Sequence, residues 1–188
     1  MTYYQSTAAG TAYTELTTST SCEVCIIGAG YAGLACAAGL IERGQSNLVL
    51  IDAEQVGYGA SGRNGGFVFG GFSLGNQSLQ RQLGPTRARQ LYQLTLDAVE
   101  LIRRRIRDYG IECAINQSGV LLANWFDDQR VLLQAQQFMQ SQFNVDWQLW
   151  SAEQTRTQLK SERYFGALHE KMPSIFIRLT MQKGWLRP

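Results

Sequence analysis

Residues 22–34 have the sequence CEVCIIGAGYAGL, and this stretch decides the fold. The apolar residues 22–27 predict a β-strand that runs directly into a G-x-G-x-x-G pattern made by Gly28, Gly30 and Gly33. In such a pattern the first glycine permits a tight turn, the second lets the backbone approach a pyrophosphate, and the third lets the next helix pack closely. The small residues that follow favour this helix, whose N-terminal N–H groups and positive dipole end would face phosphates.

The same stretch continues into a second apolar strand and ends in a carboxylate. Gly44 is placed to end the helix, the segment LVLI at residues 48–51 predicts a strand, and Asp52 follows directly. At that distance from Gly28 an acidic side chain accepts hydrogen bonds from ribose hydroxyls, and it would repel the 2′-phosphate of NADP. Strand, turn, helix, strand and acid together predict an α/β, Rossmann-like βαβ domain that binds a dinucleotide.

A second glycine-dense stretch follows, with the sequence GYGASGRNGG at residues 57–66. Its glycines give up backbone entropy that an ordinary loop would not, which indicates that a ligand approaches the backbone closely. Ser61 can donate to a phosphate oxygen and Arg63 adds a charge-assisted donor. Asn64 and the adjacent N–H groups can reach the polar edges of a ring system. The alternative is a plain flexible loop.

Together the two motifs resemble those of the FAD-dependent D-amino-acid oxidase superfamily, and within it the gamma-glutamylputrescine oxidoreductase type of amine oxidase. The resemblance extends from about Tyr3 to about Glu170 and implies FAD as the cofactor rather than NAD, a choice that the first motif alone cannot make. Asp52 stands where this family more often has glutamate, which shortens the side chain by one methylene but keeps the ribose acceptor. An NAD-dependent dehydrogenase is disfavoured because such enzymes do not need the segment 57–66.

The resemblance also implies a set of cofactor-binding residues around both glycine motifs. These are Gly28, Ala29, Gly30, Tyr31, Ala32, Gly33, Asp52, Ala53, Ser61, Gly62, Arg63, Asn64, Gly65 and Gly66. The motif glycines would cradle the pyrophosphate, Asp52 would hold the ribose, and Ser61, Arg63 and Asn64 would lie by the pyrophosphate and flavin. A full-length relative would oxidise a C–N bond of a small-molecule amine or amino acid by hydride transfer to the flavin. No catalytic residue is assigned.

Composition excludes several other classes. The chain has 188 residues, 45% of them hydrophobic, and a net charge of +2, which indicates no polyanionic partner such as nucleic acid. No run approaches the roughly 20 apolar residues of a membrane helix, and the first residues lack the features of a signal peptide, so we expect a cytoplasmic location. Cys22 and Cys25 would lie on opposite faces of one strand. All four cysteines are therefore predicted to be buried reduced thiols, and no metal site is expected.

Four segments are predicted along the chain: an N-terminal lead-in at 1–21, the N-terminal part of an FAD-binding domain at 22–110, the start of an α+β substrate domain at 111–171, and a tail at 172–188. A helix is predicted from Pro85 to Gly110. Its expected apolar stripe consists of Leu91, Leu94, Ala98, Leu101, Ile102 and Ile106. The arginines 103, 104, 105 and 107 are expected to share one solvated face of this helix rather than to bind nucleic acid.

In the substrate-domain segment we predict a strand at 119–123, a helix from Asp127 or Asp128 through Phe138, a strand at 145–149, and a helix capped by Ser151. The side chains of Trp125, Trp147 and Trp150 are expected to pack in the core or on the surface rather than to line a substrate pocket. The single histidine, His169, has no visible catalytic partner.

The resemblance stops after Lys171. A single lost nucleotide near that codon would permit a restored frame similar to the family's H-P-L-x-x-A-x-G-L-A segment, with only two alanines forced by the genetic code. The hypothesis is a frameshifted or truncated gene, or a sequencing error, which resequencing around codon 171 tests. The corresponding alternative for function is a non-catalytic fragment that binds FAD weakly or not at all.

Overall fold

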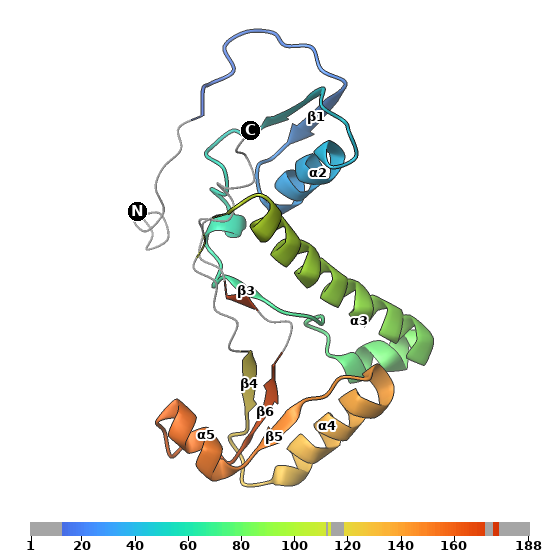
Figure 1. Cartoon of the computed structure of the whole chain (residues 1–188), viewed down its shortest axis with the longest axis vertical. Helices are drawn as coiled ribbons and strands as arrows, with labels where there is room; N and C mark the ends of the chain where they lie inside the picture. Colours follow the sequence, from blue (N-terminus) through green and yellow to red (C-terminus); the bar gives the residue numbers. More distant parts are fainter. Residues whose placement is uncertain (1–12, 112, 114–118, 172–174, 177–188) are drawn as a thin grey trace. The chain divides into compact units, whose positions relative to one another are not determined.

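The computed structural model describes residues 13–111, 113, 119–171 and 175–176 (Figure 1). Contacts divide the chain into two compact units. Among the described residues, unit 1 comprises 13–67, 104–111 and 113, and unit 2 comprises 68–103, 119–171 and 175–176. These contact-based units do not coincide with the predicted domains, which meet at residue 110. Because a contact-based unit is not the same as a domain, the predicted domain boundary stays a prediction. The predicted tail lies outside the described residues except for the strand β7 (Ile175–Phe176).

Unit 1 contains the predicted βαβ unit. Strand β1 (Val24–Ile27) pairs in parallel with β2 (Leu48–Ile51), and the register runs from Val24 opposite Leu48 to Ile27 opposite Ile51. Helix α2 (Tyr31–Ile41) joins the two strands and lies beside β1 in Figure 1. Its buried side is made of small residues and one leucine, namely Leu34, Ala37, Ala38 and Gly39. The predicted strand, helix and second strand are confirmed. They could be predicted because each follows from the local apolar pattern and the placement of glycines.

The prediction of four buried thiols was wrong, because two of the thiols are exposed and the other two are only partly buried. Cys25 and Cys36 are exposed, and Cys22 and Cys113 are partly buried. Burial alternates along β1, so Cys25 lies on its open face, as strand geometry requires. On α2 the buried positions next to residue 36 are Leu34 and Ala37, which leaves Cys36 on the opposite side of the helix.

The chain leaves β2 through a single 3₁₀ turn η1 (Ala60–Gly62) and the two-residue strand β3 (Phe67–Val68). The long helix α3 spans Asn76–Asp108 but is interrupted at Gly84, whose φ of 77° and ψ of 164° are not helical. Pro85 follows and begins the second helical part, where its missing N–H is no loss. The predicted helix start at Pro85 is therefore right for this part, while the turns at 76–83 were not predicted.

The apolar stripe of α3 differs from the predicted one. Leu94 is 60% exposed, and Ala98 is exposed as well. The buried apolar positions of this part are Ala88, Tyr92, Val99 and Ile106, and of these the predicted stripe contained Ile106 alone. These residues recur at the helical spacing of four and seven residues, so the period was recognised but the phase was not. The aromatic ring of Tyr92 sets this phase because it packs edge-on against Phe143 at 5.2 Å between ring centroids.

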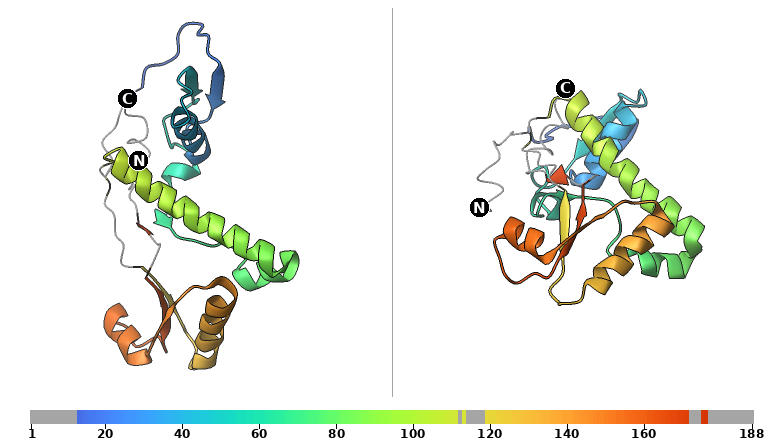
Figure 2. Two further views of the ribbon diagram at one scale, coloured as in Figure 1. Left: turned by 45° about the vertical axis from the view of Figure 1, so that its right-hand side comes forward. Right: turned by 60° about the horizontal axis from the view of Figure 1, so that its bottom comes forward.

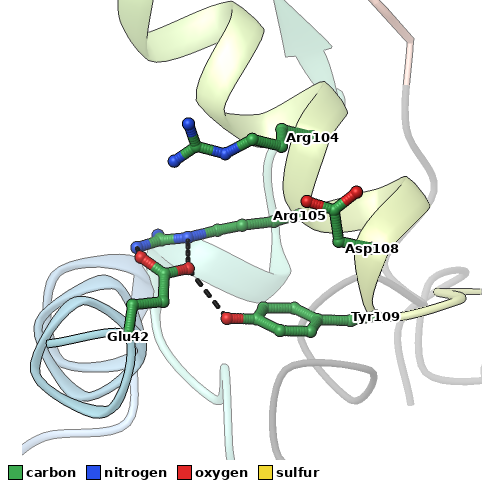
Figure 3. Close-up of a pocket in the computed structure, with 5 residues that line it drawn as sticks. All are labelled: Glu42, Arg104, Arg105, Asp108 and Tyr109. Carbon is green, nitrogen blue, oxygen red and sulfur yellow. Dashed lines mark hydrogen bonds and ion pairs between the residues drawn. The ribbon is translucent and has the colours of Figure 1, made fainter. Parts of the chain in front are cut away.

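The predicted solvated arginine face of α3 was wrong for Arg105, whereas Arg104 and Arg107 are exposed. Arg105 is only 5% exposed, and within unit 1 its guanidinium donates two hydrogen bonds to Glu42, at 2.7 and 2.8 Å. The hydroxyl of Tyr109 donates a third to the same carboxylate at 2.8 Å. Figure 3 shows the Glu42 carboxylate between these two groups, in a hollow of about 180 Å³ that Arg104 and Asp108 also line. Burial of Arg105 is possible because its charge is paired.

Unit 2 is built on a three-stranded antiparallel sheet in the order β4 (Val120–Ala123), β6 (Ala167–Glu170), β5 (Gln148–Trp150). Helices α4 (Gln129–Phe143) and α5 (Ala152–Leu159) lie on opposite sides of this sheet (Figure 2). Asp128 caps α4 through the N–H of Arg130, and Ser151 caps α5 in a reciprocal capping box with Gln154. The predicted elements of this segment are confirmed apart from their exact ends, but the central strand β6 was not predicted.

A buried carboxyl group lies at the end of β6. Glu170 is 7% exposed, and burial raises its pKa, although the nearby indole of Trp147 and hydroxyl of Tyr92 oppose that rise. Its Oε1 atom has no hydrogen-bond partner among the described residues. Leu79, Ala88, Tyr92, Met139 and Phe143 form the hydrophobic core of unit 2. A charged Glu170 beside this core would be costly, so the fold favours its neutral form.

We predict that Glu42→Gln destabilises unit 1 by roughly 2 kcal/mol at pH 7, the range for hydrogen bonds to charged groups. The Arg105 guanidinium lowers the pKa of Glu42 from 4.5 to about 2. The stabilisation is therefore complete above pH 4.5 and is lost as the pH falls through about 2. Urea midpoints of the α2 amide signals, measured against pH, test this. Asp108→Asn is the control, because the ion pair of Asp108 with Arg107 joins two side chains that are 50% and 69% exposed; equal midpoints for Glu42→Gln and the unsubstituted chain at pH 7 would contradict the prediction.

We expect Glu170→Gln to stabilise unit 2 by about 1 kcal/mol at pH 7, because the amide keeps the shape without the buried charge. Since the pKa of the folded carboxyl is raised, its stabilising protonated form is complete below pH 4.5 and is lost at higher pH. The advantage of glutamine should accordingly shrink as the pH falls below 4.5. Urea unfolding followed by tryptophan fluorescence measures it, with Glu162→Gln, 89% exposed, as control. A less stable glutamine variant at pH 7 would refute the expectation.

Candidate cofactor site

The glycine turn after β1 is fixed by backbone hydrogen bonds to the segment that follows β2. The N–H of Gly28 donates to the carbonyl oxygen of Ile51 at 2.7 Å, and the N–H of Gly57 donates to that of Ala29 at 3.0 Å. Gly28 has a φ of +103°, a backbone conformation that residues other than glycine rarely adopt. A Cβ there would meet nothing within 4 Å, so the backbone borders open space. The turn is thus rigid on one side and accessible on the other.

The other two motif glycines mark close approaches. A Cβ on Gly33 would collide with the carbonyl oxygen of Gly28, and one on Gly30 would lie 2.9 Å from the Oγ atom of Ser61. The first contact brings α2 against the turn, and the second brings the loop 57–66 against the start of α2. These contacts agree with the predicted role of Gly33 in close helix packing.

Ser61 caps helix α2 from outside the helix. The cap residue Gly30 offers no side chain, and the N–H of Tyr31 donates instead to the Oγ atom of Ser61 at 3.0 Å. The next two N–H groups, of Ala32 and Gly33, have no acceptor one turn earlier because the helix starts at Tyr31. The helix end therefore presents a hydroxyl and backbone donors together, a combination suited to phosphate oxygens.

Asn64 organises the loop that carries Ser61. Its Nδ2 atom donates to the carbonyl oxygen of Ser61 at 2.8 Å and lies within 3.2 Å of the Tyr31 hydroxyl, while its Oδ1 atom accepts from the N–H of Gly66 at 2.9 Å. Both ends of its amide thus bond to groups of the protein, and its expected reach toward a ring system stays a prediction. Arg63 is exposed and lies over the ring of Tyr58, 4.9 Å from the ring centroid.

The carboxylate of Asp52 points back to the turn. Its Oδ2 atom accepts from the N–H of Ala29 at 2.6 Å, and its Oδ1 atom accepts from the N–H of Glu54 at 2.9 Å. Both bonds favour the ionised form and lower the pKa of Asp52, the Ala29 bond most. Asp52 is exposed although Ala29 is completely buried.

Most of the predicted site residues thus gather in unit 1. Hydrogen bonds or close contacts join 28–33, Asp52, Ser61, Asn64 and Gly66. Gly62 is buried within η1, and a Cβ on Gly65 would press on the ring of Phe67. Ala53 is exposed and takes no part in the hydrogen bonds described around the turn. The prediction missed Gly57 and Tyr58, although both belong to the glycine-dense stretch that could have pointed to them.

The donors present fit the diphosphate of a dinucleotide. Such an anion requires hydrogen-bond donors, positive charge and room. The donors are the N–H groups at the start of α2 and the Ser61 hydroxyl, the charge is on the Arg63 guanidinium, and the room is beside Gly28. Among the described residues no group of three or more metal-ligating side chains could hold a metal ion. None of the described helices combines the length and apolar character needed to span a membrane.

The sequence is similar to those of known proteins. Residues 23–175 match the family described as FAD dependent oxidoreductase. The chain is 34% identical over 157 residues to gamma-glutamylputrescine oxidoreductase of Escherichia coli (strain K12), covering 83% of this chain and 36% of that relative. It is 32% identical over 171 residues to the probable oxidoreductase OrdL of Haemophilus influenzae, covering 89% and 39%. The chain therefore spans less than two fifths of either relative.

Solved structures agree on the fold. L-amino acid deaminase from Proteus myxofaciens has a TM-score of 0.69 at 20% identity, covering 96% of this chain and 38% of that one. Glycine oxidase from Bacillus cereus has a TM-score of 0.60 at 18% identity, covering 88% and 42%. Since the family match extends over far more than half of its residues, the chain belongs to the FAD dependent oxidoreductase family.

Proposed function

We propose that this chain supplies the FAD-binding part of an oxidoreductase that oxidises a C–N bond in a small-molecule amine or amino acid. The observation that carries the proposal is the cluster in which the glycine turn, the start of α2 and the loop 57–66 present phosphate-binding groups to one open side. The family match and the gamma-glutamylputrescine oxidoreductase of Escherichia coli support this class of reaction.

In this proposal the protein's residues bind and orient the cofactor, while bound FAD supplies the capacity to accept a hydride from the substrate carbon. The N–H groups at the start of α2 and the Ser61 hydroxyl hold the diphosphate, and Asn64 keeps Ser61 in place through its carbonyl oxygen. Arg63 adds positive charge from a side chain that rests on Tyr58. Asp52 lies at the end of β2, where its carboxylate accepts a hydrogen bond from the N–H of Ala29 in the glycine turn.

Retention of FAD by the purified chain tests the proposal. We expect an absorption spectrum with flavin bands after incubation with FAD and desalting, and no binding of NAD under the same conditions. The distinction follows from the loop 57–66, which a dehydrogenase that uses NAD does not require. A colourless protein, or equal binding of NAD and FAD in a titration, would refute the proposed cofactor.

A pair of glycine variants tests the geometry. Gly33→Ala should weaken FAD binding more than about tenfold, or 1.4 kcal/mol, because its methyl group would meet the Gly28 carbonyl oxygen. Gly59→Ala is the matched control, since a Cβ there meets nothing within 4 Å and no positive φ is required. Alanine in a helix is otherwise favourable by about 1 kcal/mol over glycine. Equal FAD affinities for the two variants, measured by flavin fluorescence, would show that close helix packing is not needed.

A further inference from the structure

Asn64 is the only asparagine of the chain that a glycine follows. The side-chain carbon Cγ of an asparagine can be attacked by the backbone nitrogen of the next residue, which closes a five-membered succinimide ring. A side chain on that next residue obstructs the attack, and glycine has none. Asn144, by comparison, precedes the β-branched residue Val145. The bond between Asn64 and Gly65 is therefore the place in the chain where this reaction meets the least obstruction.

The structure folds the Asn64 side chain back over the following backbone. Its Oδ1 atom accepts from the N–H of Gly66 at 2.9 Å, which closes a local turn of the kind that asparagine favours. The closed ring passes through both reacting atoms, Cγ of Asn64 and the backbone nitrogen of Gly65. Within the described part of the chain the N–H of Gly65 donates to no acceptor. Both residues are exposed, so water can reach the ring once it has formed.

The nitrogen that this reaction would remove holds the loop together. The Nδ2 atom of Asn64 donates to the carbonyl oxygens of Ser61 at 2.8 Å and Ala60 at 3.3 Å, and it lies 3.2 Å from the Tyr31 hydroxyl. These bonds restrain the amide, but on an exposed loop they open readily. An ionised carboxylate in the same place has acceptors only. It would face the two carbonyl oxygens without a proton to offer them.

We propose that Asn64 is a site of spontaneous deamidation, and that the product loses the loop geometry on which the candidate cofactor site depends. The Gly65 nitrogen forms a bond to Cγ of Asn64 and gives up its proton, while the Cγ–Nδ2 bond breaks and that nitrogen leaves as ammonia. Water then opens the succinimide to aspartate or, at the backbone carbonyl, to isoaspartate. No oxidant or reductant takes part. The inference rests on the proposed function only where FAD is concerned.

The change would reach helix α2 through Ser61. The Ser61 hydroxyl accepts from the N–H of Tyr31 at 3.0 Å, and the Asn64 amide holds the same residue by its carbonyl oxygen. With that hold lost, the hydroxyl is no longer fixed at the start of α2. Isoaspartate also adds a methylene to the main chain, and either product places a negative charge beside the groups proposed to bind a diphosphate. Repulsion between the two anions opposes binding.

The first test needs no ligand. The chain is incubated in mildly alkaline buffer, and its peptides are followed over time by mass spectrometry. Aspartate and isoaspartate should accumulate at Asn64 well before Asn144, and Gly65→Ala should slow the reaction because its methyl group shields the attacking nitrogen. That methyl group presses on the side chain of Phe67, which can move. If Gly65→Ala does not fold, the comparison with Asn144 decides. An Asn64 that survives as long as Asn144 would overturn the proposal.

The second test measures the consequence with Asn64→Asp, which reproduces one product. Amide hydrogen exchange of Tyr31, followed by NMR without ligand, should accelerate about tenfold, the equivalent of one hydrogen bond. Asn144→Asp, in unit 2, should leave it unchanged. FAD should bind Asn64→Asp more than about tenfold more weakly than the unsubstituted chain. Unchanged Tyr31 exchange in folded Asn64→Asp would refute the structural consequence. If the unsubstituted chain binds no FAD, the proposed function fails, and the mass and exchange measurements still decide the role of Asn64.

Discussion

The start of α2 lies so close to the preceding turn that residue 33 can carry no side chain. The carbonyl oxygen of Gly28 occupies the place where a Cβ would be. This one contact sets the position of the helix relative to β1, and through it the direction of the first N–H groups of α2. Ser61 can cap that helix only because the helix starts there and Gly30 leaves room for its hydroxyl. The loop 57–66 is held at the start of α2 through this Ser61 contact, and the hydrogen bonds of Asn64 hold the loop together internally.

The βαβ unit could be predicted because its rules are local. A short apolar strand, a glycine turn and small helical residues each restrict the backbone within a few positions, so β1, α2 and β2 appear where the sequence placed them. The caps at Asp128 and Ser151 were predicted for the same reason, since a capping side chain bonds to N–H groups two or three residues away. That the residues of the candidate cofactor site come together could be predicted, but their hydrogen-bond partners could not. Which atoms the Asp52 carboxylate and the Asn64 amide meet depends on how separate segments come together.

The errors have a common cause in contacts between residues far apart in the chain. Helical period alone gave the stripe of α3 its spacing, yet Leu94 is exposed and Tyr92 is buried because Phe143 packs on the tyrosine ring. Arg105 was predicted to be one of several surface arginines, because the neighbouring sequence does not indicate that its partner is Glu42. Strand β6 escaped prediction because all four of its residues are buried, so the polar–apolar alternation of a half-exposed strand is missing.

The ion pair between Glu42 and Arg105 joins residues 63 positions apart, and between them the chain passes through the whole first stretch of unit 2. During synthesis on the ribosome the strands and helix of the βαβ unit emerge first, yet Glu42 has no buried partner until the far end of α3 has been made. Closing so long a loop is slow compared with local pairing. The βαβ unit is therefore begun early in translation and completed late, and a nascent chain that stalls between residues 52 and 105 would expose the α2 surface that Arg105 later covers.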